Sequence, residues 1–151
     1  MAAFLRLAGA EARLEELPTA TATAAEAADA VGCVLTQIVK SLVLLADAAP
    51  VVVLVPGDRR ADTGKVARLL GARRVSVARA ADVLASTGFA PGAVAPFPLE
   101  NVESVLVERR LLRHETLWAG GGSERHLVSL SPDELVRLTR GRVEDFVLES
   151  P

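Results

Sequence analysis

Residues 38–55 read IVKSLVLLADAAPVVVLV, and this stretch determines which kind of fold the chain can adopt. Its two apolar runs, residues 38–45 and 51–55, are rich in β-branched side chains and too short for typical helices. Residues 47–50 lie between the two runs and have the composition of a turn. We therefore predict a β-hairpin that is buried on at least one face.

Helices and strands are predicted to alternate on both sides of this hairpin. Three helices are expected to begin at the capping residues Thr23, Asp62 and Ser131 and to end at Gly32, Leu70 and Leu138, and a fourth covers residues 80–87. Strands are predicted over residues 74–78, 103–108, 116–119 and 126–130. Residues 5–17 are rich in Ala, Leu, Arg and Glu and are predicted to form an opening helix that stops at Pro18.

Length and composition indicate one folded domain over residues 1–151, in which residues 1–20 form an N-terminal helix and linker. Hydrophobic residues make up 50% of the chain, and the formal net charge is −2. This charge argues against a protein that coats nucleic acid, although a local basic patch remains open. A single cysteine, no signal-peptide core and no membrane-length apolar segment predict a cytoplasmic protein.

Most motifs of known chemistry are missing from the sequence. It contains no Walker loop, no Gly-x-Ser-x-Gly elbow and no His-Glu-x-x-His zinc motif. His114 and His126 are far apart in the chain and are interpreted as surface or structural groups, so neither a metal nor a cofactor is expected. Cys33 has no activating neighbour in the sequence and is interpreted as buried and inert.

Lys40 interrupts the apolar pattern of the predicted hairpin. On a strand it shares one face with Ile38 and Leu42, and the opposite face is also mainly aliphatic. An unpaired ammonium is costly to bury, so Lys40 must reach water at a strand end, find a partner, or line a cavity that receives an anionic or carbonyl group. The local pattern leaves these alternatives open.

Residues 89–98, FAPGAVAPFP, contain too much Pro and Gly for regular structure. Gly92 can adopt backbone conformations that other residues avoid, and Pro96 fixes the chain behind it. Such a loop can direct backbone amides toward a substrate oxygen, or it can serve as a plain rigid connection.

Together these segments resemble the YbaK/prolyl-tRNA synthetase-associated domain family, the editing deacylases that hydrolyse mischarged aminoacyl-tRNA. The resemblance covers residues 21–139 and depends on the order and spacing of several segments: 23–32, 37–43, 56–60, 65–71, 87–97 and 131–135. It implies a mixed α/β (α+β) fold, in which helices flank a strongly curved, barrel-like mixed β-sheet. It implies no cofactor.

The resemblance also assigns site residues. The essential lysine of the family falls on Lys40, and its Gly-x-x-x-Pro loop, whose amides hold the acyl carbonyl end of the substrate, falls on residues 92–96. Lys40 and Gly92 are therefore the expected catalytic residues. The expected substrate-binding residues are Ser41, Ala95, Pro96, Phe97 and Ser123. In the family the loop often reads Ser-Pro-Phe-Gly, where this chain has Ala95-Pro96-Phe97-Pro98.

The function implied by this resemblance is deacylation in trans of mischarged tRNA for proline, carrying cysteine or alanine. The expected partners are the acceptor end of aminoacyl-tRNA and prolyl-tRNA synthetase, with no membrane. One alternative is a non-catalytic homologue that binds the tRNA acceptor end or a synthetase. A second alternative is a protein with a small-molecule pocket unrelated to tRNA.

Overall fold

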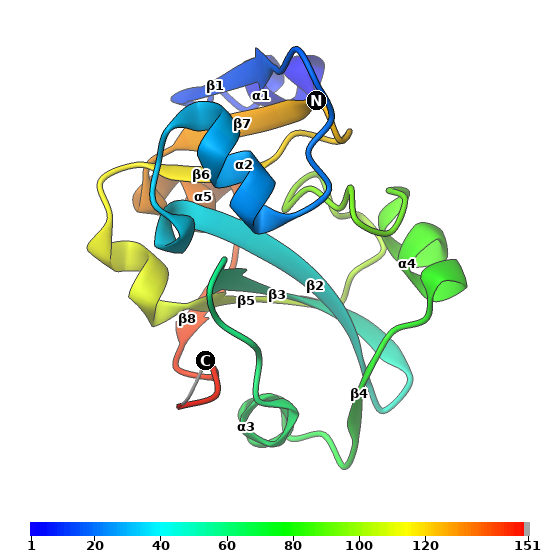
Figure 1. Ribbon diagram of the computed structural model, residues 1–151. Helices are drawn as coiled ribbons and strands as arrows, with labels where there is room; N and C mark the ends of the chain where they lie inside the picture. Colours follow the sequence, from blue (N-terminus) through cyan, green and yellow to red (C-terminus); the bar gives the residue numbers. More distant parts are fainter. Residues whose placement is uncertain (150–151) are drawn as a thin grey trace.

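The protein is described from a computed structural model that covers residues 1–149 (Figure 1). Its centre is one mixed β-sheet with the strand order β1-β7-β6-β2-β3-β5-β8, and β4 pairs with β2 outside this path. The strands are β1 (Ala12–Glu16), β2 (Ile38–Ala46), β3 (Ala49–Pro56), β4 (Val75–Val77), β5 (Ser104–Glu108), β6 (Leu117–Gly120), β7 (His126–Leu130) and β8 (Arg142–Glu144). The helices are α1 (Ala2–Leu7), α2 (Ala24–Val31), α3 (Thr63–Leu70), α4 (Ala80–Thr87) and α5 (Pro132–Thr139), with short 3-10 helices η1 (Leu35–Gln37) and η2 (Arg109–Arg113).

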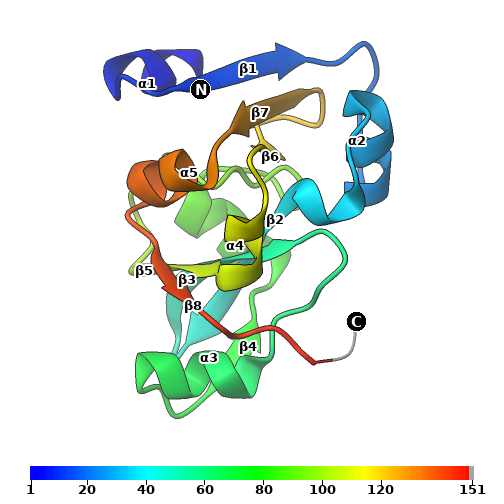
Figure 2. The same cartoon turned by 90° about the vertical axis from the view of Figure 1, so that its left-hand side faces the viewer.

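This arrangement confirms the predicted mixed α/β fold with flanking helices. The sheet curves, as Figure 2 shows from the side, and helices pack against it at several places. Its terminal strands β1 and β8 do not pair with each other, so the sheet is open and the barrel-like description holds only for its curvature.

The predicted hairpin is confirmed as β2 and β3, which pair antiparallel from Val39↔Pro56 to Ala46↔Ala49. The turn consists of Asp47 and Ala48, whose φ angles of 49° and 70° lie in the left-handed region that two-residue hairpin turns require. The side chains from Val51 to Val55 are buried because β3 is an interior strand.

The prediction of one helix over residues 5–17 is wrong. Helix α1 ends at Leu7, Gly9 adopts a φ of 61°, and the chain then forms strand β1. Strand β1 pairs antiparallel with β7 in the register Leu14↔Val128. The backbone bonds offered by the edge of β7 outweigh the helix propensity of these residues. The short strand β8 was also not predicted, and it pairs in parallel with β5.

The predicted helix caps are confirmed. The Thr23 hydroxyl accepts a hydrogen bond from the Glu26 amide at 3.1 Å, and the Asp62 and Ser131 side chains cap α3 and α5 in the same way. These caps fix where α2, α3 and α5 begin, and hence where the helices lie on the sheet.

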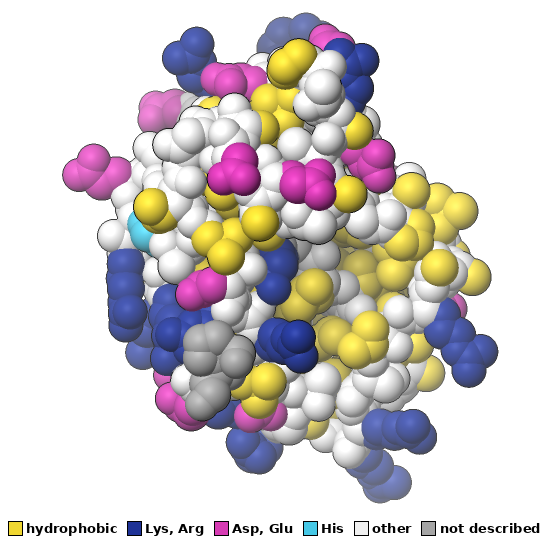
Figure 3. Space-filling view, in the orientation of Figure 1, with side chains coloured by type: hydrophobic (Ala, Val, Ile, Leu, Met, Phe, Trp, Pro, Cys, Tyr) yellow, Lys and Arg dark blue, Asp and Glu magenta, His cyan; other side chains and the backbone are white. Residues whose placement is uncertain are grey.

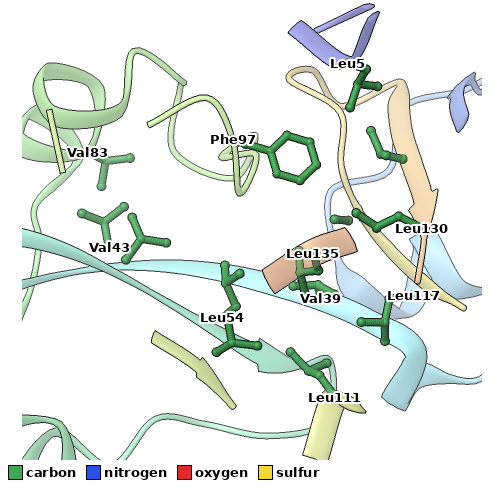
Figure 4. Packing of buried hydrophobic residues seen from close by; sticks show 14 residues of the cluster. Leu5, Val39, Val43, Leu54, Val83, Phe97, Leu111, Leu117, Leu130 and Leu135 are labelled. Carbon is green, nitrogen blue, oxygen red and sulfur yellow. The ribbon is translucent and has the colours of Figure 1, made fainter. Parts of the chain in front are cut away.

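Three apolar clusters hold the layers together. The largest contains Phe97, Val43, Leu117 and Leu135, and Figure 4 shows Phe97 pointing into it. A second cluster packs α3 against Leu44 and its neighbours, and a third packs α2 against Ile38. On β2, therefore, one helix covers the residues before Lys40 and another covers the residues after it.

Candidate functional site

A cavity of about 290 Å³ lies between α2, β2, the loop at residues 92–94 and the turn between β6 and β7. Figure 3 shows the surface hollowed between α2 and β2. Among its lining residues are Lys40, Ser41, Gly92, Trp118, Ser123 and His126. Four of the seven predicted site residues, namely Lys40, Ser41, Gly92 and Ser123, thus line this one cavity.

The cavity exists because one edge of β2 is paired only near its ends. Along this edge β6 pairs with Ile38 and Val39, and β4 pairs with Leu44 to Ala46. Within residues 1–149, no strand pairs with Lys40, Ser41 or Leu42 on this side. The interruption leaves room for the 92–94 loop to approach β2, and the space between them is the cavity.

Lys40 lines the cavity from strand β2, with Asp58 and Arg60 as the nearby charged groups. The side chain is half-buried, and within residues 1–149 it makes no hydrogen bond or ion pair. Burial lowers the pKa of Lys40, the positive charge of Arg60 lowers it further, and Asp58 partly offsets both effects. Lys40 thus lines a cavity, which was one of the alternatives left open by the sequence.

Ser41, the next residue on β2, carries the second unpaired polar group of the wall. Its hydroxyl oxygen is buried and has no hydrogen-bond partner within the described residues. A buried polar group without a partner costs free energy that a ligand can recover by bonding to it. Ser41 is also one of the residues that line the cavity.

Gly92 occupies a tight turn at the cavity rim. The Ala93 amide donates to the Ala90 carbonyl at 2.9 Å, Pro91 precedes Gly92, and the Gly92 φ is 83°. Pro followed by Gly with positive φ is the pattern of a type II turn. Within residues 1–149, the amides of Gly92 and Val94 donate to no backbone carbonyl, and both residues line the cavity.

Gly120 on β6 fixes the position of this loop. A Cβ atom at Gly120 would lie 3.0 Å from the Val94 carbonyl oxygen, closer than most side chains tolerate. The absence of a side chain lets the loop backbone lie directly against β6.

The loop residues Ala95, Pro96 and Phe97 do not line the cavity. Ala95 and Phe97 are buried, and the Phe97 ring stacks on Phe4 with ring centroids 5.3 Å apart. These residues attach the loop to the main apolar cluster.

The cavity lining contains a Ser123–His126 pair that the sequence analysis did not predict. The Ser123 hydroxyl and His126 Nδ1 are 2.6 Å apart, and both residues line the cavity. The sequence interpretation of His126 as a surface or structural group overlooked this position, because the β6–β7 turn brings the two side chains together. The sequence did contain a signal for this pair, because Ser123 and His126 are three residues apart and follow three consecutive glycines in the turn. His114 lies in a separate cleft.

Other groups add little to this site. Cys33 is partly exposed, and burial raises the pKa of its thiol, which disfavours the nucleophilic thiolate. Residues 1–149 contain no cluster of three or more His, Cys, Asp or Glu side chains placed to hold a metal ion. Within the same residues, every helix is too short or too polar to cross a bilayer.

The chain is similar to proteins of known sequence and structure. A family model described as "Aminoacyl-tRNA editing domain" matches residues 18–138. "Uncharacterized protein YwhH" of Bacillus subtilis is 32% identical over 131 residues, which are 85% of this chain and 82% of that protein. A proline–tRNA ligase of Nitratidesulfovibrio vulgaris is 35% identical over 132 residues, which are 84% of this chain but 23% of the ligase.

A more distant relative and a solved structure extend the comparison. The "Putative Cys-tRNA(Pro)/Cys-tRNA(Cys) deacylase EbsC" of Enterococcus faecalis is 24% identical over 125 residues, covering 82% of this chain and 76% of that protein. The crystal structure of a "putative trans-editing enzyme for prolyl tRNA synthetase" superposes with a TM-score of 0.86 at 36% identity, covering 98% of both chains.

Proposed function

Because this chain belongs to the aminoacyl-tRNA editing domain family, we propose that it removes cysteine or alanine from mischarged tRNA for proline, acting as a free-standing enzyme. The family membership agrees with the resemblance found in the sequence and supports aminoacyl-tRNA deacylation as the reaction class. The observation that carries the finer proposal is the common cavity of Lys40 and the Gly92 turn.

The reaction is hydrolysis of an ester between the amino acid and the terminal ribose of the tRNA. Water adds to the carbonyl carbon, the carbonyl oxygen gains negative charge, the bond to the ribose oxygen breaks, and that oxygen leaves with a proton. The ester is reactive enough that an enzyme can accelerate this reaction by positioning and charge stabilisation, without a protein nucleophile. This fits a cavity wall that lacks a complete nucleophilic triad.

In the proposed mechanism Lys40 and the Gly92 turn both bind the substrate in this cavity. The half-buried ammonium of Lys40 binds the carbonyl oxygen or the terminal phosphate, and the free amides of Gly92 and Val94 donate to the developing oxyanion. Each such contact contributes about 2–4 kcal/mol to lowering the barrier. Ser41 offers its unpaired hydroxyl to the bound aminoacyl group.

The size of the cavity supports a small amino acid. Its volume of about 290 Å³ is at the low end for ligand sites, so a bulky side chain would compete with the ribose for space. The names of EbsC and of the solved trans-editing relative support tRNA for proline as the substrate. Ala95, Pro96 and Phe97 serve substrate binding indirectly in this scheme, because they hold the loop in place.

Deacylation assays test the proposal. We expect purified protein to release amino acid, with multiple turnovers, from Cys-tRNA or Ala-tRNA for proline, and we expect it to leave Pro-tRNA intact. Lys40→Ala should abolish release while the circular dichroism spectrum stays unchanged. If a panel of mischarged tRNAs survives incubation, the enzymatic function is refuted, and tRNA binding without turnover would favour the non-catalytic alternative. A partnership with prolyl-tRNA synthetase in the cytoplasm belongs to the same proposal.

A further inference from the structure

A second cleft, of about 230 Å³, lies at the end of the β2–β3 hairpin opposite the Asp47 turn. We call it the arginine cleft, and its polar lining residues are Thr36, Asp58, Arg59, Arg110, Arg113 and His114. Three arginines face one aspartate in this lining. The cleft is therefore locally cationic in a chain whose net charge is −2.

The three arginines differ in how many of their N–H donors and how much of their charge are already paired within the protein. Arg110 lies 3.4 Å from the fully buried Glu108 and 3.5 Å from Asp145, so its charge is compensated. Arg59 donates one bond to the Glu149 carbonyl at 3.2 Å and lies 3.9 Å from Asp58. The Arg113 guanidinium is exposed and has no hydrogen bond or ion pair within residues 1–149. A guanidinium has five N–H donors, so Arg113 and part of Arg59 remain free for an anion.

The arginine cleft lies close to the Lys40 cavity along the chain. Thr36 in the cleft precedes Lys40 by four residues, and Pro56 in the cleft pairs with Val39. Four residues of extended chain span at most about 14 Å. Stacked nucleotides advance about 3.4 Å each along one strand, so roughly four nucleotides bridge this distance.

The charges around the cavity distinguish its two sides. Glu124 lines the cavity wall and the exposed Glu26 lies in the first turn of α2, whereas Lys40 and Arg60 lie toward the arginine cleft. Figure 3 shows acidic side chains over α2 and basic side chains below the hollow and on the side of η2. A polyanion whose end enters the cavity is repelled by the acidic side and attracted to the basic one.

We propose that the arginine cleft binds a backbone phosphate of the tRNA acceptor end while the aminoacyl ester occupies the Lys40 cavity. Arg113 and Arg59 supply the phosphate contacts, and Arg110 ties η2 to Glu108 at the end of β5 and to Asp145. This inference rests on the proposed deacylase function, and it adds the direction from which the RNA approaches. The cleft binds a phosphodiester. Substitutions in the cleft should therefore not change the hydrolysis of a substrate that lacks a phosphodiester.

Arg113→Glu tests this assignment with two substrates. One is alanyl-tRNA for proline, and the other is 3′-O-alanyl-adenosine, which carries the same ester and no phosphate. We expect the substitution to raise the KM for alanyl-tRNA about tenfold with kcat little changed, and to leave hydrolysis of alanyl-adenosine at the wild-type rate. The slope of log kcat/KM against log salt concentration should become shallower by about 0.7–0.9, the value for one lost phosphate contact.

Arg13→Glu is the matched control, because Arg13 is an exposed arginine on β1 outside both the cavity and the cleft. It should leave both substrates and the salt slope unchanged. The proposal is overturned if Arg113→Glu keeps the wild-type KM and salt slope with alanyl-tRNA, or if it slows both substrates equally.

If the proposed deacylase function is wrong, the wild-type protein will hydrolyse neither substrate. The proposal for the arginine cleft is then tested by the binding of uncharged tRNA, measured by fluorescence anisotropy at two salt concentrations. Weaker binding by Arg113→Glu than by wild type supports the cleft, and equal binding refutes it.

Discussion

Lys40 and Gly92 line the same cavity, although one lies in the first half of β2 and the other in a loop that follows α4. The two meet because β2 lacks a strand partner beside residues 40–42 within the described part of the chain, and the loop lies over that interruption. A cation and free backbone amides are thereby brought to one small volume.

Lys40→Met should reduce activity and increase stability. It removes the cation from the cavity, so we expect kcat/KM for alanyl-tRNA to fall about 10²–10³-fold. It also removes a half-buried charge, so the free energy of unfolding at pH 7 should rise. Urea denaturation and deacylation rates measure the two effects. A variant that loses activity and stability together would contradict a functional role for this ammonium.

The pH dependence of that stability gain has a defined sign. The pKa of Lys40 is lower in the folded protein than in the unfolded chain, because burial disfavours the ammonium. Below the folded pKa, the wild type therefore bears the full cost of the charge, and its stability rises as pH passes from the folded toward the unfolded pKa. The difference between Lys40→Met and wild type should be largest near neutral pH and shrink in alkaline solution. A difference that stays constant up to the alkaline limit would exclude this cause.

Gly92→Ala should lower activity more than its effect on stability explains. Gly92 has a φ of 83°, and a Cβ atom added there would meet no other atom within 4 Å, so the cost is backbone strain of about 1–2 kcal/mol without a clash. The backbone of the variant can relieve this strain by changing the conformation of the turn, which would displace the residues that line the cavity. Gly71→Ala at the end of α3 is a matched control, with a φ of 64° and equally open surroundings. We expect similar losses in melting temperature and a tenfold or larger loss of kcat/KM for Gly92→Ala alone. Equal activities of the two variants would remove the turn from the mechanism.

His126→Ala and Ser123→Ala test the pair on the cavity wall. Loss of the imidazole removes a hydrogen-bonding group from the site, and one such bond contributes about 0.5–1.5 kcal/mol, which corresponds to a decrease in kcat/KM of up to about tenfold. Ser123→Ala keeps the ring but removes its 2.6 Å tether, so its effect should be smaller. Single-turnover deacylation rates give the comparison. Wild-type rates for both variants would show that the pair is structural.

Phe97→Leu should have the opposite pattern to Lys40→Met. The ring is 1% exposed and belongs to the main apolar cluster, so we expect the free energy of unfolding to fall by about 1–3 kcal/mol. At a temperature where the variant is fully folded, kcat/KM should stay within about twofold of wild type. A strong loss of activity at unchanged stability would instead indicate direct contact with the substrate.

Much of the fold could be predicted because local sequence specifies it. The hairpin at residues 38–55, the caps at Thr23, Asp62 and Ser131, and the irregular loop at residues 89–98 were each predicted from patterns within a few residues, and the structure has them. The predictions failed for segments whose secondary structure depends on pairing with strands that are distant in the sequence. Strand β1 forms because β7 offers an edge, and β8 forms because β5 does.

The sequence alone determined that a charged residue interrupts an apolar strand and that a Gly-containing loop is rigid, because charge, side-chain shape and backbone freedom are properties of the residues themselves. Only the tertiary structure decided that Lys40 faces a cavity, that the loop closes over it, and that Ser123 holds His126. Those relationships depend on where strands fail to pair and on which helices cover each face. Such long-range packing is not encoded in any single short segment.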